Sequence, residues 1–207
     1  MPGFAQAQRR ALADLFIEKG PSAPTLCEGW NASDLAAHIV IRERRPDAAV
    51  GILAAPLAAY SERVRRSTRD TNSWTDLVAQ VRNGPPAPLR PIDDAINTVE
   101  FYVHHQDLRR AGDATAWPEE DPALQEALWR HLRSMSRILF RRSPVGVTLD
   151  AGSYGLASAK GGPATVTLRG MPSELLLFGF GRTRVAKVDL DGDDVSVERL
   201  RQTRLGL

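Results

Sequence analysis

The chain contains very little cysteine and histidine. Cys27 is the single cysteine, so no disulfide can form within the chain, which is typical of proteins from a reducing compartment. A thiol just before a predicted helix could act as a nucleophile, but the interpretation favoured here is a small, packed loop side chain. The sequence has only four histidines: His38, His104, His105 and His131.

Long hydrophobic runs are also missing. The longest apolar stretch, residues 48–60, is too short to cross a bilayer and contains Pro56. The first ten residues have no apolar segment of the signal-peptide type. These absences predict a soluble, cytoplasmic protein without a membrane partner.

The charge pattern argues against a nucleic-acid partner. The net charge is only +2, from 27 basic and 25 acidic residues, although the sequence pI is about 9.0. Arginines cluster at residues 42–45, 63–69 and 141–142, but acidic residues are interspersed, which is typical of solvated helix faces. Phosphate-binding glycine loops, dinucleotide fingerprints and Gly-x-Ser-x-Gly motifs are absent from the sequence.

Hydrophobic periodicity predicts helices through the first two thirds of the chain. Apolar residues at helical spacing, bounded by glycine, proline and capping residues, define these segments. The second predicted helix starts at Asn31 or Ser33, both good caps, and ends near residue 45. The other predicted helices cover residues 4–19, 58–69, 77–82 (opened by residues 73–76), 92–110 and 122–140, with a short continuation at 48–55. Residues 84–88 are predicted to form a rigid proline-rich linker.

After Pro144 the pattern changes to the alternation that is typical of strands. Strands are predicted at residues 145–149, 164–168, 185–190 and 195–198, with a short helix near 172–180. The acidic run 189–194 resembles a calcium loop, but its glycine is at the wrong offset, so a hairpin turn at Asp191-Gly192 is predicted instead. The expected architecture is α+β, with a helical domain at 1–142 and a small α/β domain at 143–207.

One pair of residues suggests chemistry. Glu100 and His104 are four residues apart in a predicted helix, so both side chains point the same way. A third donor from His38, on another predicted helix, would complete a carboxylate and two-imidazole set for zinc, nickel, iron or cobalt. Asp34 and Asp107 lie near these histidines in the sequence and could orient their rings.

Two simpler interpretations stay open at this point. Glutamate four residues before histidine is a common solvated helix pair. His38, among alanine and isoleucine, could instead be a core histidine that donates to a backbone carbonyl. His105 points away from His104 by about 100°, so both are not expected to bind one ion, and His131 is interpreted as surface or interface polarity.

Two sequence segments give more information about function than the spacing of the three residues does. The run from Leu26 to His38 (LCEGWNASDLAAH) resembles the segment with which DinB-like metal-binding bundles present their first histidine, and residues 98–107 (TVEFYVHHQD) resemble their later Glu-x-x-x-His helix. Within that superfamily the chain is most similar to the mycothiol-dependent maleylpyruvate isomerase branch, and residues 38–47 resemble an actinobacterial group of metal-binding proteins. The resemblance implies a DinB-like four-helix bundle followed by a sterol-carrier-like domain, to which residues 170–182 are similar.

The resemblance also implies a function. His38, Glu100 and His104 match the metal triad, zinc is the expected metal and mycothiol the expected thiol cofactor. The protein is then a thiol-dependent transferase or isomerase that acts on a small electrophile, with Arg42 as a candidate for binding an anionic substrate. Arg169 and Arg182 are further basic candidates that surface roles explain equally well, and a homodimer is compatible with the sequence.

The alternative is a non-enzymatic module that binds metal or a small apolar ligand. Its cavity would lie in the sterol-carrier-like domain. The side chains proposed to line it are Leu175, Leu176, Leu177 and Phe178.

Overall fold

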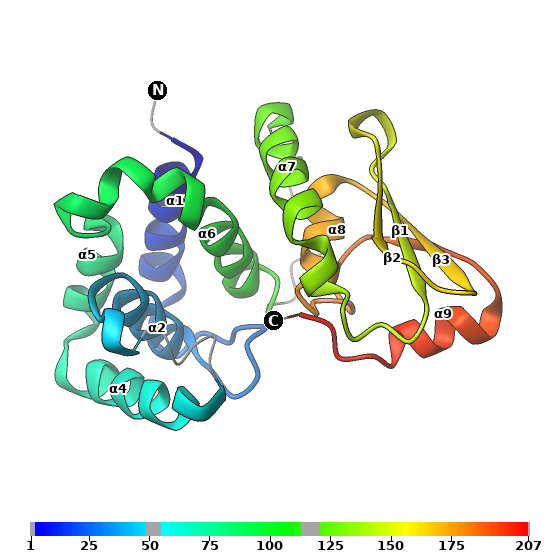
Figure 1. Ribbon diagram of the computed structural model, residues 1–207. Helices are drawn as coiled ribbons and strands as arrows, with labels where there is room; N and C mark the ends of the chain where they lie inside the picture. The colour runs from blue at the N-terminus through cyan, green and yellow to red at the C-terminus, as the bar shows by residue number, and fades with distance from the viewer. Residues whose placement is uncertain (1–2, 49–54, 113–120, 207) are drawn as a thin grey trace. The chain divides into compact units, whose positions relative to one another are not determined.

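A computed structural model describes residues 3–48, 55–112 and 121–206. The chain divides into two compact units, Met1–Ala116 and Trp117–Leu207 (Figure 1). Most of the predicted helical continuation at 48–55 lies outside the described residues.

The regular elements in the described part of the N-terminal unit are all helices, as the periodicity predicts. Two of them start at a side-chain cap: Asn31 accepts from the backbone N–H of Asp34, and Ser73 accepts from that of Asp76. The elements are α1 (Phe4–Lys19), α2 (Ala32–Arg44), the 3₁₀ turn η1 (Ala55–Leu57), α4 (Ala58–Thr71), α5 (Trp74–Asn83), the 3₁₀ segment η2 (Ala87–Ile92) and α6 (Asp93–Arg109).

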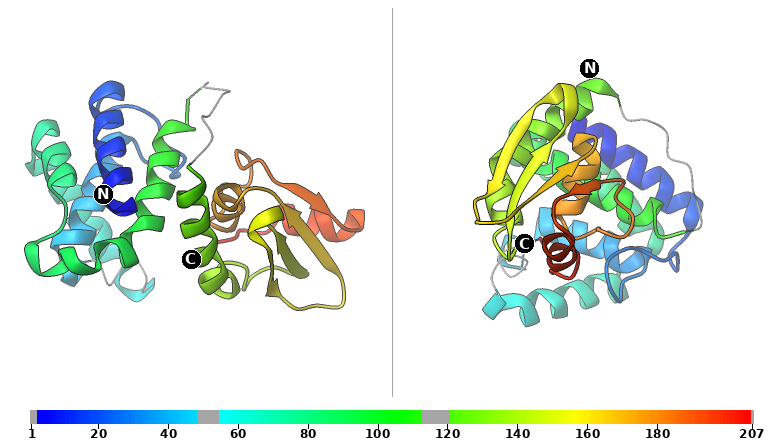
Figure 2. Two further views of the ribbon diagram at one scale, coloured as in Figure 1. Left: turned by 90° about the horizontal axis from the view of Figure 1, so that it is seen from above. Right: turned by 90° about the vertical axis from the view of Figure 1, so that its right-hand side faces the viewer.

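These helices enclose one apolar core. α1 packs along α6, and α2 packs against α4 and α5 (Figure 2). Fully buried side chains from four of them meet in the centre: Leu12, Phe16, Leu35, Ile39, Val81 and Phe101. Five α-helices lie in the described part of this unit, so the predicted count of four is not confirmed. The packing of α2 and α6 into one core is what positions the candidate site.

The C-terminal unit combines a small mixed sheet with helices. The sheet has the strand order β2-β1-β3-β4, in which β1 pairs in parallel with β3 and the other two pairings are antiparallel. The elements are α7 (Pro122–Leu139), β1 (Gly146–Asp150), the 3₁₀ turn η3 (Gly152–Tyr154), β2 (Leu156–Lys160), β3 (Thr165–Arg169), α8 (Pro172–Gly179), β4 (Asp189–Asp191) and α9 (Asp194–Arg201).

α7 lies in the second of the two compact units, which divide between residues 116 and 117, and the domain bounds 1–142 and 143–207 stay a prediction. Its apolar stripe packs against α8 and β2. A buried pair of hydrogen bonds fastens it there: Gln125 donates to the Ser173 hydroxyl and accepts from the Ser173 backbone N–H, each at 2.9 Å. The side chains proposed to line an apolar cavity in α8, Leu175 to Phe178, are at most 2% exposed, as expected of core residues.

Two predictions for the last segment are wrong. Residues 195–198 form part of α9 rather than a strand, because Asp193 accepts from the backbone N–H of Ser196 and starts a helix there. The predicted hairpin at Asp191-Gly192 is therefore a strand-to-helix connection. β2 was not predicted, since its sequence (LASAK) has little of the β-branched or aromatic character typical of strands.

Across the described ranges, no helix is both long and apolar enough to cross a bilayer.

Candidate metal centre

The structure brings His38, Glu100 and His104 together. His38 lies in α2, and the other two lie one turn apart in α6. Nε2 of His38 is 3.3 Å and Nε2 of His104 is 3.1 Å from the same carboxylate oxygen, Oε1 of Glu100. The donor atoms of all three residues lie within 4.8 Å of one another.

This donor set fits a divalent cation. Zinc bonds to nitrogen and oxygen of about 2.0–2.1 Å, in a tetrahedral arrangement, place neighbouring donor atoms roughly 3.4 Å apart, close to the spacing seen here. The histidine side chains are 9% and 10% exposed, whereas Glu100 is 22% exposed, so the group reaches solvent on one side. The same distances also suit hydrogen bonds, so the geometry permits a metal site without requiring one.

Asp107 supports His104 from the side away from Glu100. Its Oδ2 lies 2.9 Å from Nδ1 of His104 and accepts from the Cys27 thiol at 3.2 Å. The Asp107 side chain is fully buried, and its backbone carbonyl accepts from the N–H of Leu26, which ties the loop before α2 to α6. This is the contact that the predicted orienting role of Asp107 requires.

The electrostatics of the centre favour a charged carboxylate. Burial alone would raise the pKa of Glu100, but hydrogen bonds from His104 and His38 hold it well below its ordinary value. Burial lowers the pKa of His38. For His104 burial acts in the same direction, but the contacts with Asp107, Cys27 and Glu100 outweigh it and raise the pKa well above its usual value. The raised pKa favours a protonated His104 imidazole in the metal-free centre, and a cation bound at Nε2 would displace that proton.

Arg42 lies at the same carboxylate. Its Nε is 3.1 Å from Oε1 of Glu100, and its terminal nitrogens donate to the side chain of Asn97 and the backbone carbonyl of Ile96. Asn97 in turn donates to Asp93 at 2.6 Å, so the guanidinium of Arg42 is fixed from two sides. The side chain is 24% exposed and keeps donors beyond these contacts, as binding an anion requires.

The same polar chain continues to a cavity. Arg9 donates to Asp93 at 2.8 Å and lines a cavity of about 390 Å³ together with residues such as Arg82 and Asp94. Arg9 also pairs with Glu43 at 2.7 Å and is only 1% exposed. A continuous series of contacts thus runs from this cavity through Asp93 and Asn97 to the centre.

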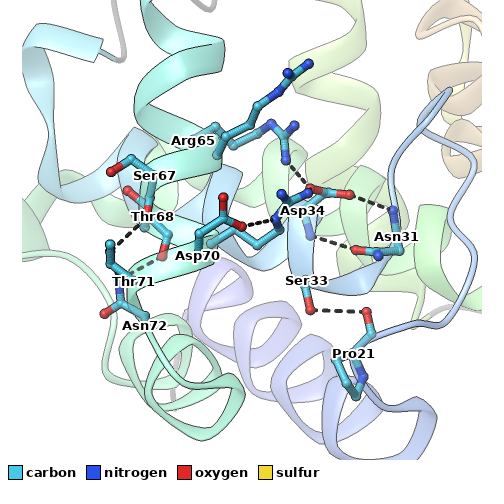
Figure 3. Close-up of polar contacts among 12 residues, drawn as sticks. Pro21, Asn31, Ser33, Asp34, Arg65, Ser67, Thr68, Asp70, Thr71 and Asn72 are labelled. Carbon is cyan, nitrogen blue, oxygen red and sulfur yellow. Dashed lines mark hydrogen bonds and ion pairs between the residues drawn. The ribbon is translucent and has the colours of Figure 1, made fainter.

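Asp34 has partners that point to a role other than orienting His38. One oxygen accepts from Arg65 and Arg69, and the other accepts from the backbone N–H of Asn31 at 3.2 Å (Figure 3). It therefore completes the capping box at the start of α2 and joins α2 to α4. The predicted contribution of Asp34 to the metal centre stays a prediction without support from these contacts.

Replacing Asp34 by asparagine is expected to lower the free energy of unfolding by about 2–4 kcal/mol at pH 7, because it weakens a helix cap and leaves Arg65 without a buried carboxylate. Burial raises the pKa of Asp34, but its donors lower it below the ordinary 3.8. A depressed pKa stabilises the folded state above that value, so the difference from the parent should shrink as the pH falls below about 4. Urea unfolding across pH measures this, with D70N at the exposed Asp70 as the control.

Replacing Asp107 by asparagine is expected to weaken zinc binding about 10-fold or more, since the amide keeps the size but loses the charge that favours a donating Nδ1 on His104. Competition with a chromophoric chelator gives the dissociation constant. An unchanged constant in a folded D107N variant would show that Asp107 has only a packing role.

The remaining candidates lie elsewhere or have other partners. His105 faces α1, where its Nδ1 contacts Gln8 at 3.0 Å, and burial lowers its pKa to about 4. His131 lies in α7 of the other unit. Arg169 pairs with Asp150 and Asp191 on the sheet surface, and Arg182 donates to the Phe180 carbonyl, so the structure gives both ordinary local roles.

Two residues near the centre, Trp30 and Arg65, were not predicted from the sequence to have a role there. The indole of Trp30 lies against the ring of His38, with centroids 5.1 Å apart. Arg65 belongs to the arginine cluster at residues 63–69, which was predicted to lie on a solvated helix face, but its side chain is only 5% exposed. A tryptophan in the loop directly before the histidine helix was the available signal for the first, but nothing in the pattern singled out Arg65 from the other arginines.

Comparison with known protein families finds a similarity in the N-terminal unit. A family model described as mycothiol maleylpyruvate isomerase N-terminal domain matches residues 4–96. Over these residues the N-terminal unit is similar to that family. The match includes His38 and ends shortly before Glu100, so the similarity covers α2 but only the first residues of α6.

A solved structure supports the architecture of the chain. The crystal structure of the mycothiol-dependent maleylpyruvate isomerase is similar with a TM-score of 0.55 and 16% sequence identity, over 93% of this chain and 97% of that one. At this identity the similarity shows a shared fold, a helical part followed by a small α/β part. No curated protein sequence matches the chain.

Proposed function

We propose that the N-terminal unit binds one divalent cation, zinc in the first instance, through His38, Glu100 and His104, and that the protein is a thiol-dependent transferase or isomerase of small electrophiles. The observation that carries the proposal is the convergence of two imidazole Nε2 atoms on one carboxylate oxygen in a partly exposed position. When bound there, the cation supplies the positive charge that lowers the pKa of a coordinated thiol.

The thiol class follows from the family. The matched domain and the enzyme of the similar crystal structure are both named for mycothiol, so mycothiol is the first thiol to test. In a transfer, the thiol sulfur bonds to an electrophilic carbon, and the thiol proton passes to solvent or to a leaving group. In an isomerisation, the sulfur adds and is expelled again, so free thiol is conserved.

The protein's own residues supply support and positioning. Asp107 fixes the orientation of His104, while the carboxylate of Glu100 balances the charge of the imidazoles and Arg42. Arg42 is the candidate for an anionic group of the substrate, because Asn97 and Glu100 hold its guanidinium at the exposed edge of the centre.

The test combines zinc-loaded protein, mycothiol and a panel of electrophiles that includes maleylpyruvate. Transferase activity consumes free thiol, and isomerase activity changes the substrate absorbance at constant thiol. The H104A variant should lose either activity, whereas H131A, a histidine variant in the other unit, should keep it. Stoichiometric zinc without activity toward any electrophile would reduce the function to metal binding, and a fully active H104A would contradict the assignment of the site.

A further inference from the structure

Trp30 is held in a defined position beside the metal centre. An isolated bridge pairs Pro24 with Asn31, and Thr25 donates from its hydroxyl to the Trp30 carbonyl at 2.9 Å. The Trp30 backbone N–H donates to the carbonyl of Cys27 at 3.0 Å. These contacts close the loop before α2 and place the indole against the imidazole of His38, with a ring-centroid distance of 5.1 Å and an angle of 49° between the planes.

Arg65 reaches the same indole from α4. Its Cζ lies 4.7 Å from the centre of the Trp30 ring, within the range of a cation–π contact. The guanidinium is oriented by two acids: Glu62 accepts from Nε and from a terminal nitrogen at 2.8 and 2.7 Å, and Asp34 accepts from the other terminal nitrogen. The side chain is 5% exposed, so this arginine is packed rather than solvated.

We propose that Arg65 and Trp30 are positioning residues for His38, with Arg65 holding the indole against the imidazole so that Nε2 stays directed at Glu100. The proposal rests on the function proposed above. Rotation of a histidine ring about χ2 is only weakly restricted by the backbone, so neighbouring rings decide where its nitrogens point. A flat guanidinium suits an indole face better than a lysine ammonium does, and Arg65 therefore acts through Trp30 without touching the cation.

The contacts of Trp30 with Arg65 and with His38 predict that substitutions of Arg65 and Trp30 affect zinc affinity non-additively, which a general stabilising role of Arg65 does not predict. If Arg65 acts through Trp30, its removal should cost zinc affinity only while the indole is present. The variants R65M, W30L and R65M/W30L form the cycle. R66M is the matched control, because Arg66 is the next residue on α4, is 65% exposed and pairs with Glu62 at the surface.

The readout is the zinc dissociation constant, measured by chelator competition well below the unfolding midpoint of each variant. R65M and W30L should each weaken binding about 10-fold, as expected for residues that orient a ligand from outside the coordination sphere. The double variant should be no weaker than W30L, and R66M should match the parent. The proposal is overturned if the double variant binds zinc about tenfold more weakly than W30L, since the two effects would then be independent. It is also overturned if R65M has the same zinc dissociation constant as R66M.

Two further measurements distinguish a positioning role from a purely structural one. R65K retains the charge for Asp34 but not the flat stack, so it should fold and still bind zinc more weakly than the parent; binding equal to the parent would count against the stack. A variant with a lower unfolding midpoint but an unchanged zinc constant shows a structural role alone. If the parent itself fails to bind zinc, the proposed function is what has failed; if the parent binds and the cycle shows no coupling, only this inference falls.

Discussion

Replacing Glu100 by glutamine is expected to weaken zinc binding by at least about 100-fold. The carboxylate is the single acid in the candidate triad, and both imidazoles and Arg42 face its Oε1. The amide keeps the shape but removes the negative charge, so a cation would meet two neutral imidazoles beside an uncompensated guanidinium. The expected loss exceeds the 10- to 100-fold range that is typical of residues outside the coordination sphere.

Chelator competition on the purified E100Q variant measures this effect, and E18Q, at an exposed glutamate on α1, is the matched control. Folding is checked separately by circular dichroism and thermal unfolding without metal. A folded E100Q variant with the zinc affinity of the parent would mean that the three residues form an ordinary hydrogen-bonded cluster.

Replacing Arg9 by methionine is expected to lower the free energy of unfolding by about 3–5 kcal/mol. Arg9 is 1% exposed, stacks on Phe101 with Cζ 4.0 Å from the ring centre, and pairs with Glu43 and Asp93. Its loss leaves Glu43 buried without a cation. Burial already raises the pKa of Glu43, and without Arg9 this pKa should rise further.

The pH dependence of R9M follows from that shift. A raised pKa in the folded state means that protonation stabilises the fold, so R9M should recover part of its loss as the pH falls toward the ordinary glutamate range. The double variant R9M/E43Q should recover part of it at pH 7. R10M, one residue along at an exposed position, should stay within about 0.5 kcal/mol of the parent in urea unfolding. A loss below about 1 kcal/mol in R9M would show that the ion pair contributes little.

The helical half of the fold could be predicted because its signals are local. The bounds of α1 match the predicted 4–19, and Asn31, one of the two possible caps, starts α2. The C-terminal unit was harder, because alternation at residues 195–198 also fits one face of a short capped helix. The placement of α7 in this unit depends on what its apolar stripe packs against, which a stripe alone does not specify.

For the candidate site, too, the locally determined features could be predicted and those that depend on tertiary packing could not. One helical turn fixes the spacing of Glu100 and His104, so the sequence predicted that pair directly. His38 was proposed as the third donor from its place on another predicted helix, and the resemblance supported that choice. The surroundings depend on tertiary packing: Arg65 lies in a cluster whose charge pattern indicates a solvated face, yet α4 brings it onto Trp30. Asp34 was predicted near the centre from its spacing, but its contacts are with the start of α2 and with α4.

The most direct test of the metal centre is metal analysis of the purified protein after equilibration with zinc and removal of unbound metal, beside the H38A and H131A variants. We expect close to one zinc per chain in the parent and in H131A, and a marked loss in H38A, because His38 brings the donor from α2 to the pair on α6. A parent that retains no zinc, or an H38A variant that retains as much as the parent, would contradict the proposed site.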